Sequence, residues 1–173
     1  GITRIRGVAE MVRAMDFLPA DANARLALAG PFDSPALERE VEDLAGIDRT
    51  DLLGPLQRDK VAEHLGSGRV GLVLLHPVPA YLESVPTKMF EYMAAGLPVI
   101  ASNFPAWRTL IEGIGCGLVA NPLDPADIAH AIQWIFEHPA EAEEMGERGR
   151  EAVLKDYNWE AEARRLVEAY DRL

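Results

Sequence analysis

Residues 70–76 read VGLVLLH and residues 98–102 read PVIAS, two apolar runs of strand length. Neither run alternates between polar and apolar positions, and such continuous apolarity is typical of parallel strands that helices cover on both faces. Similar runs occupy residues 25–29, 51–54 and 117–120, and apolar residues at helical spacing occupy residues 7–16, 34–44, 58–65, 86–95 and 105–112. This alternation predicts an α/β fold: a doubly wound parallel sheet in a three-layer α/β/α arrangement, with a ligand crevice beyond the carboxyl ends of the strands.

Both ends of the chain depart from this alternation. Residues 125–137, 140–156 and 159–173 predict extra C-terminal helices with no returning strand, and Asn158 is the expected N-cap of the last one. An apolar stripe along that last helix is expected to pack against another surface; it consists of Trp159, Ala163, Leu166, Tyr170 and Leu173. Residues 1–4 lead directly into helical sequence, as if they ended a first strand, so we expect further sequence upstream.

The composition is that of a globular protein, and the length of 173 residues predicts one domain over residues 1–173. A net charge of −11 opposes binding to nucleic acid or to an anionic membrane, and no apolar run approaches the roughly 20 residues of a membrane span. Cys116 is the only cysteine, which excludes an intrachain disulfide and favours a cytoplasmic location. The histidines lack metal-ligand spacing and no D-x-D string occurs, so neither a metal nor a cofactor is expected.

One glycine-rich string resembles a dinucleotide-binding fingerprint. Residues 66–71 read GSGRVG and match G-x-G-x-x-G. The fingerprint requires a strand before it and a helix after it, whereas here a helix is expected before it and a strand after it. We therefore interpret the string as an ordinary connecting loop.

Two glutamates, Glu83 and Glu91, lie on either side of Pro86 in residues 81–102, which read YLESVPTKMFEYMAAGLPVIAS. Proline suits the first position of a helix, so Glu83 is expected in the preceding loop and Glu91 in the second helical turn. Because this helix follows the strand at residues 70–76, its free N–H groups should point into the crevice and favour an anion. Lys88 adds a cation in the first turn. The alternative is an ordinary amphipathic helix whose acidic residues suit the helix dipole.

Residues 83–102 resemble the E-x7-E region of the family 4 retaining glycosyltransferases, and the part reading PTKMFEYMAAGLPVIAS is closely similar to bacterial members. Residues 116–125, CGLVANPLDP, are similar to the family's C-G-x-L-V-x-P-x-D-P turn, and NWEAEARRLVEAY at residues 158–170 is similar to its ending. The resemblance covers essentially the whole chain. It implies the GT-B architecture, in which two Rossmann-like domains face each other across a cleft, and it identifies this chain as the C-terminal, donor-binding domain.

The resemblance also implies roles for particular residues. Glu83 would be the catalytic residue, contacting the sugar hydroxyls near the anomeric centre, and Glu91 would accept hydrogen bonds from the ribose, because a carboxylate takes two hydroxyl donors at once. Arg6, which precedes a glycine as in the family, would neutralise the diphosphate together with Lys88. The alternative for Arg6 is a solvated position on the surface.

The loop in which the family has E-G-F-G-L reads ESVPT here, at residues 83–87. Ser84 and Thr87 complete the predicted donor-binding set. Pro86 removes one of the N–H donors that a diphosphate would use in this loop.

The implied activity is that of a hexosyltransferase that takes a nucleotide-diphospho-sugar as donor without a metal ion. The acceptor machinery would lie in an N-terminal domain outside this chain, so the isolated domain would bind donor weakly and transfer nothing. In the family the last helix crosses toward that domain, and its stripe, left exposed here, is expected to promote self-association. Two alternatives stay open: half of a sugar-nucleotide epimerase, and a non-catalytic scaffold of the same fold.

Overall fold

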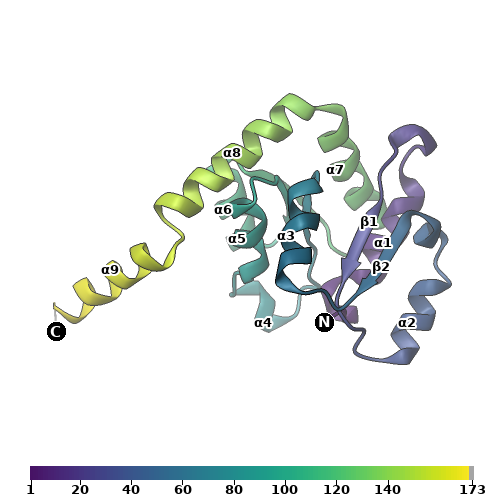
Figure 1. Cartoon of the computed structure of the whole chain (residues 1–173), viewed down its shortest axis with the longest axis horizontal. Helices are drawn as coiled ribbons and strands as arrows, with labels where there is room; N and C mark the ends of the chain where they lie inside the picture. The colour runs from purple at the N-terminus through teal and green to yellow at the C-terminus, as the bar shows by residue number, and fades with distance from the viewer. Residues whose placement is uncertain (172–173) are drawn as a thin grey trace.

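The computed structural model describes residues 1–171, in which strands alternate with helical segments as far as residue 120 and three helices follow (Figure 1). The strands are β1 Leu26–Ala29, β2 Thr50–Gly54, β3 Gly71–Val73, β4 Val99–Ser102 and β5 Gly117–Ala120. The helices are α1 Val8–Phe17, α2 Pro35–Glu42, α3 Arg58–Ser67, α4 Pro79–Leu82, α5 Thr87–Ala94, α6 Pro105–Ile114, α7 Pro125–Glu137, α8 Pro139–Lys155 and α9 Trp159–Tyr170. Three short 3-10 helices complete the chain: η1 Arg4–Arg6, η2 Ala20–Ala22 and η3 Ala45–Arg49.

All strand pairs are parallel, as the continuous apolar runs predict, but the strands form two sheets. One sheet contains β1 and β2, and the other contains β3, β4 and β5 in that order. The second sheet is in register from Gly71 opposite Val99 to Ser102 opposite Ala120. Within residues 1–171, β1 and β3 each end a sheet and do not pair with one another.

Successive residues of the second sheet contribute to two separate apolar cores. Ile100 packs in the core that includes α1 and α7, whereas Val99 and Ala101, its neighbours on β4, pack in the core that includes α5 and α6. Because successive side chains of a strand point to opposite faces, helices cover both faces of this sheet. The predicted α/β class with three layers is confirmed.

Local sequence signals explain several helix ends. The Asp124 carboxylate accepts hydrogen bonds from the backbone N–H groups of Ala126 and Asp127 at the start of α7. The Asn158 side chain caps α9 by accepting from the N–H of Ala161 at 2.9 Å, as predicted. The string at residues 66–71 is a connecting loop, since it joins the end of α3 to β3.

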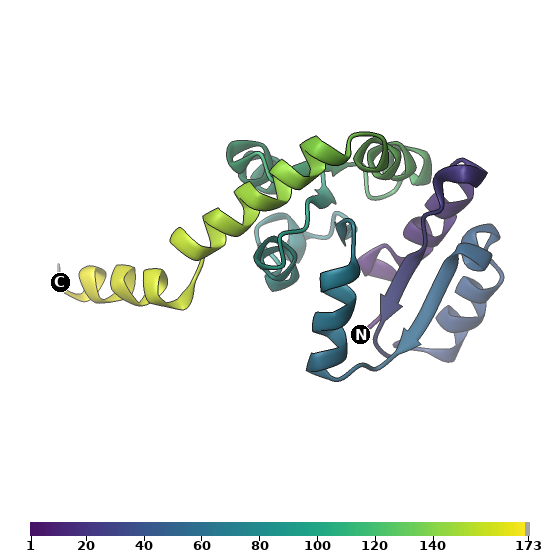
Figure 2. The ribbon, with the colours of Figure 1, turned by 45° about the horizontal axis from the view of Figure 1, so that its top comes forward.

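The last helix differs from its prediction. α9 extends away from the rest of the molecule (Figures 1 and 2), and Ala161 is its only buried residue in the described part of the chain. Trp159 is 77% exposed, and Leu166 and Tyr170 are exposed as well; Leu173 lies outside the described residues. The expectation that this stripe packs against another surface is therefore wrong for Trp159, Leu166 and Tyr170, because α9 extends away from the rest of the molecule. No helix among the described residues is long and apolar enough to cross a membrane.

Candidate functional site

The site forms where the turn before α1 meets the chain that follows β3. Gly7 ends η1 in the left-handed region at φ 68°, and α1 begins at the next residue. A Cβ atom at Gly7 would lie 2.1 Å from the carbonyl oxygen of Leu74, so only glycine permits this approach. The backbone N–H of His76 donates to the carbonyl of Ile5 at 2.9 Å and holds the same two segments together. The turn that carries Arg6 is therefore fixed against the end of β3.

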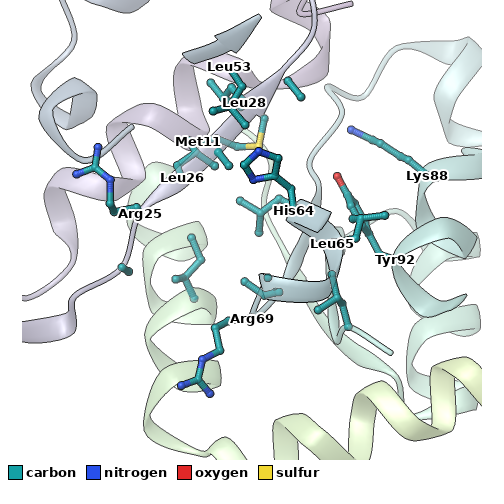
Figure 3. A pocket seen from close by; sticks show the side chains of 18 of the residues that line it. Met11, Arg25, Leu26, Leu28, Leu53, His64, Leu65, Arg69, Lys88 and Tyr92 are labelled. Atoms are coloured by element: carbon teal, nitrogen blue, oxygen red, sulfur yellow. The ribbon is translucent and has the colours of Figure 1, made fainter. Parts of the chain in front are cut away.

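Arg6 and Lys88 bring two cations to this position from distant parts of the sequence. The exposed guanidinium of Arg6 donates to the carbonyl of Gly1 at 3.0 Å. Lys88 lies in the first turn of α5 and points into the pocket (Figure 3). Burial and, to a smaller extent, the positive charge of Arg6 lower the pKa of Lys88 to about 8, while the charge of Glu91 acts in the opposite direction. Among residues 1–171, Lys88 has no hydrogen-bond or ion-pair partner.

Glu91 follows Lys88 by three residues on α5 and is exposed at the same cavity. The cavity has a volume of about 810 Å³, and Arg6, Lys88, Glu91 and Tyr92 all line it. Tyr92 packs beside Gly71, and its pKa is raised by burial and by the charge of Glu91. The structure thus gathers three of the predicted residues, two cations and one carboxylate, at one opening.

Glu83, Ser84 and Thr87 are not among the residues that line this cavity. Glu83 is exposed immediately after α4, in the loop that leads to α5, as predicted. The Ser84 hydroxyl donates to the carbonyl of Ala80 at 2.8 Å, so this group closes the end of α4. Thr87 is exposed at the first position of α5; the helix begins there and not at Pro86, which is the N-cap residue.

Two interactions at the site could not be predicted from sequence spacing. Trp107 is buried, and its indole Nε1–H donates to the carbonyl of Ser84 at 2.6 Å. His76, for which the sequence offered no partner, lies 3.1 Å from a carboxylate oxygen of Glu10 on α1, and both side chains are mostly buried. Each pair joins segments far apart in the chain. Within the described residues, no three His, Cys, Asp or Glu side chains gather as a metal site would require.

Replacing Trp107 by phenylalanine should loosen the loop that carries Glu83. Phenylalanine keeps an aromatic ring in the core but removes the N–H that holds Ser84, which costs about 1 kcal/mol of unfolding free energy. Hydrogen exchange of the amides at residues 83–85 should become faster. Trp134→Phe is the matched control, because Trp134 stacks on His138 away from this loop. Unchanged exchange at residues 83–85 in the Trp107 variant would show that the indole does not hold the loop.

Comparison with known proteins identifies a family and several proteins to which this chain is similar. The family model described as "Glycosyl transferases group 1" matches residues 2–152. The MMP alpha-(1->4)-mannosyltransferase of Mycolicibacterium hassiacum is 22% identical over 97% of this chain, which spans 40% of that protein. The sucrose-phosphate synthase of Thermosynechococcus elongatus superimposes with a TM-score of 0.80 at 29% identity, over 98% of this chain and 42% of the synthase. HepE of Anabaena, solved with UDP, superimposes with a TM-score of 0.83 at 16% identity, over 98% of this chain and 46% of HepE.

Proposed function

Because the chain belongs to the group 1 glycosyltransferases, we propose that it is the donor-binding half of a retaining enzyme that transfers a hexosyl group from a nucleotide-diphospho-sugar to an acceptor. The observation that carries the proposal is Lys88, a mostly buried ammonium group beside Arg6 that has no anionic partner bonded to it within residues 1–171. A cation held in this way at the start of a helix suits a phosphate group.

The diphosphate would lie between the α1 turn and the start of α5. Arg6 and Lys88 would contribute charge, and the N–H groups of Thr87 and Lys88 would donate hydrogen bonds from the first turn of α5. The N–H of Met89 already donates to the carbonyl of Pro86, and Pro86 itself has no N–H, so Thr87 and Lys88 are the donors that the first turn of α5 offers to the anion. Glu91 would accept hydrogen bonds from the two ribose hydroxyls.

Glu83 would contact the hydroxyls of the donor sugar near its anomeric carbon. In the transfer step, the bond between that carbon and the diphosphate oxygen breaks and its electron pair leaves with the diphosphate. The acceptor oxygen then bonds to the anomeric carbon on the same face, which retains the configuration, and its proton passes to the departing diphosphate oxygen. Arg6 and Lys88 would stabilise the negative charge that develops on the leaving group and supply the positive charge without a metal ion.

The chain spans less than half of the relatives described above, so the acceptor is assigned to a second, N-terminal domain. We expect the isolated chain to bind nucleotide weakly and to transfer no sugar, because the cleft closes around both substrates only when both domains are present. We assign the reaction to the cytoplasm. The exposed stripe on α9, with Trp159 and Tyr170, would mediate self-association of the isolated chain.

Calorimetric titration with UDP, GDP and ADP tests the donor site. UDP is the first nucleotide to test, since it is present in a solved protein of the same fold. Glu91→Ala should weaken binding of the preferred nucleotide by about 10-fold or more, because hydrogen bonds to a charged group are lost. Glu151→Ala, which removes an exposed glutamate of α8, is the matched control. Failure of the wild-type chain to bind any of the three nucleotides would contradict the donor site and favour a scaffold of the same fold.

A further inference from the structure

The short turn that carries Arg6 leaves the side chain of this residue with little support of its own. η1 contains three residues, and the N–H of Arg6 donates within it to the carbonyl of Thr3 at 3.1 Å. The guanidinium is exposed, and among residues 1–171 it bonds to the carbonyl of Gly1 alone. Its place therefore depends on what holds the backbone on either side of Arg6.

His76, just beyond β3, holds that backbone on both sides. Its N–H donates to the carbonyl of Ile5 at 2.9 Å, immediately before Arg6. Its ring nitrogen Nε2 lies 3.1 Å from a carboxylate oxygen of Glu10, which belongs to the first turn of α1 after Gly7. One residue thus contacts the chain before and after the turn of Arg6 and Gly7.

The chain after His76 leads to the second part of the proposed site. The N–H of Val78 donates to the carbonyl of His76 at 2.8 Å, α4 begins at Pro79, and Glu83 follows α4. A shift of His76 relative to α1 would therefore move the loop of Glu83 relative to Arg6. His76 links the segment proposed to bind the diphosphate with the segment proposed to contact the sugar.

The side chains of Glu10 and His76 form a buried pair. They are 15% and 18% exposed, and the two facing atoms are fully buried and form no hydrogen bond with any other group in the described part of the chain. Two apolar side chains of similar volume usually give as much stability as a buried polar pair, or more, because burial removes the polar groups from water. A polar contact, however, depends on distance and angle, whereas an apolar contact tolerates sliding. The pair therefore suits positioning better than stabilisation.

We infer that Glu10 and His76 are positioning residues of the donor site, which hold the turn of Arg6 where its guanidinium and Lys88 bind the same diphosphate. The inference rests on the proposed function. Neither Glu10 nor His76 lines the cavity, so both act through Arg6 and not by touching the ligand. Without the pair the turn occupies other positions as well, and the apparent affinity falls with the fraction of chains that stay competent to bind.

Nucleotide titration in two backgrounds tests this route. His76→Leu should weaken binding of the preferred nucleoside diphosphate, among UDP, GDP and ADP, by roughly 3- to 10-fold, the usual effect of one polar contact. In an Arg6→Ala background the same substitution should change the affinity by less than about 2-fold, because the group that it positions is gone. Equal losses in both backgrounds would overturn the inference, and so would an Arg6→Ala variant that binds as tightly as the wild type.

His138→Leu is the matched control for His76→Leu. His138 is a partly buried histidine between α7 and α8, and its ring nitrogen Nδ1 lies 2.9 Å from the carbonyl oxygen of Trp134. Neither of these helices carries a residue of the proposed site. The control should therefore bind the nucleotide as the wild type does.

The double variant Glu10→Leu with His76→Leu separates positioning from stability. It leaves no unpaired buried polar group of this pair, so its midpoint of urea denaturation should lie closer to that of the wild type than the midpoint of either single variant does. Its nucleotide affinity should nevertheless stay low. Glu10→Gln, which keeps an oxygen at the same reach, should bind like the wild type. Affinity that recovers together with stability in the double variant would overturn the inference, since the pair would then be structural only.

Hydrogen exchange of the His76 amide provides a measurement that needs no ligand. This N–H donates to Ile5, so its exchange rate reports how firmly the turn is held. Exchange should be faster in Glu10→Leu and unchanged in Glu10→Gln. Absence of nucleotide binding by the wild type would contradict the proposed function, whereas equal protection of this amide in the wild type and in Glu10→Leu would overturn the positioning role by itself.

Discussion

Replacing Lys88 by methionine should weaken nucleoside diphosphate binding by roughly 10- to 100-fold, the cost of losing a charged hydrogen-bond donor at a phosphate. Methionine has a similar length and an apolar stem, so it should occupy the mostly buried position of Lys88 without disturbing α5. Calorimetric titration of both chains measures the effect. Lys155→Met is the matched control, because Lys155 is an exposed lysine at the end of α8. Equal affinities of wild type and Lys88→Met would remove Lys88 from the site.

The lowered pKa of Lys88 gives this prediction a pH dependence. With a pKa of about 8, Lys88 is roughly half protonated at pH 8, and a bound anion favours the protonated form. Binding at pH 8 should therefore take up about half a proton, and affinity should fall as the pH rises above 8. Lys88→Arg should bind without proton uptake, because arginine stays charged throughout this range. Affinity of the wild type that is constant from pH 7 to pH 9 would contradict the lowered pKa.

The same pKa makes the stability of the free chain depend on pH. In the unfolded chain a lysine keeps its ordinary pKa of 10.5, so between pH 8 and 10.5 the unfolded state binds more protons than the folded state. The contribution of Lys88 to the free energy of unfolding should therefore increase with rising pH in this window. Urea denaturation at several pH values, compared with Lys88→Met, isolates that contribution, because the methionine variant lacks it.

Replacing Gly7 by alanine should lower the free energy of unfolding by about 3 kcal/mol or more. Alanine at φ 68° is strained, and its Cβ would lie 2.1 Å from the Leu74 carbonyl oxygen, so α1 and β3 must separate. Gly96→Ala is the matched control: Gly96 has φ 74°, but nothing lies within 4 Å of an added Cβ, so only the strain of about 1 kcal/mol remains. Urea denaturation measures both.

The Gly7 variant also tests the site, because Arg6 precedes Gly7 directly. A shift of this turn moves the Arg6 guanidinium relative to Lys88, so nucleotide affinity should fall in Gly7→Ala and stay unchanged in Gly96→Ala. If the two variants lose equal stability, the close approach of Gly7 to Leu74 does not determine how α1 packs.

Much of the secondary structure is predictable from the sequence, for local reasons. β5 and α7 begin and end where their apolar patterns predict, and Asp124 and Asn158 cap their helices as residues of their types should. Glu83, Lys88 and Glu91 share one short loop and helix, so their order along the chain already places them near each other. In each case the feature involves residues that are close together in the sequence, so spacing along the chain is enough to predict it.

Other features depend on which segments meet, and spacing along the chain does not contain that information. The nearness of Arg6 to Lys88, the pairing of Glu10 with His76 and the bond from Trp107 to Ser84 join distant segments. The two separate sheets are equally non-local, because strand order is a property of partners and not of a strand's own residues. The apolar stripe of α9 shows the same limit: residue spacing defines an apolar face, but only the tertiary structure determines whether another surface covers it.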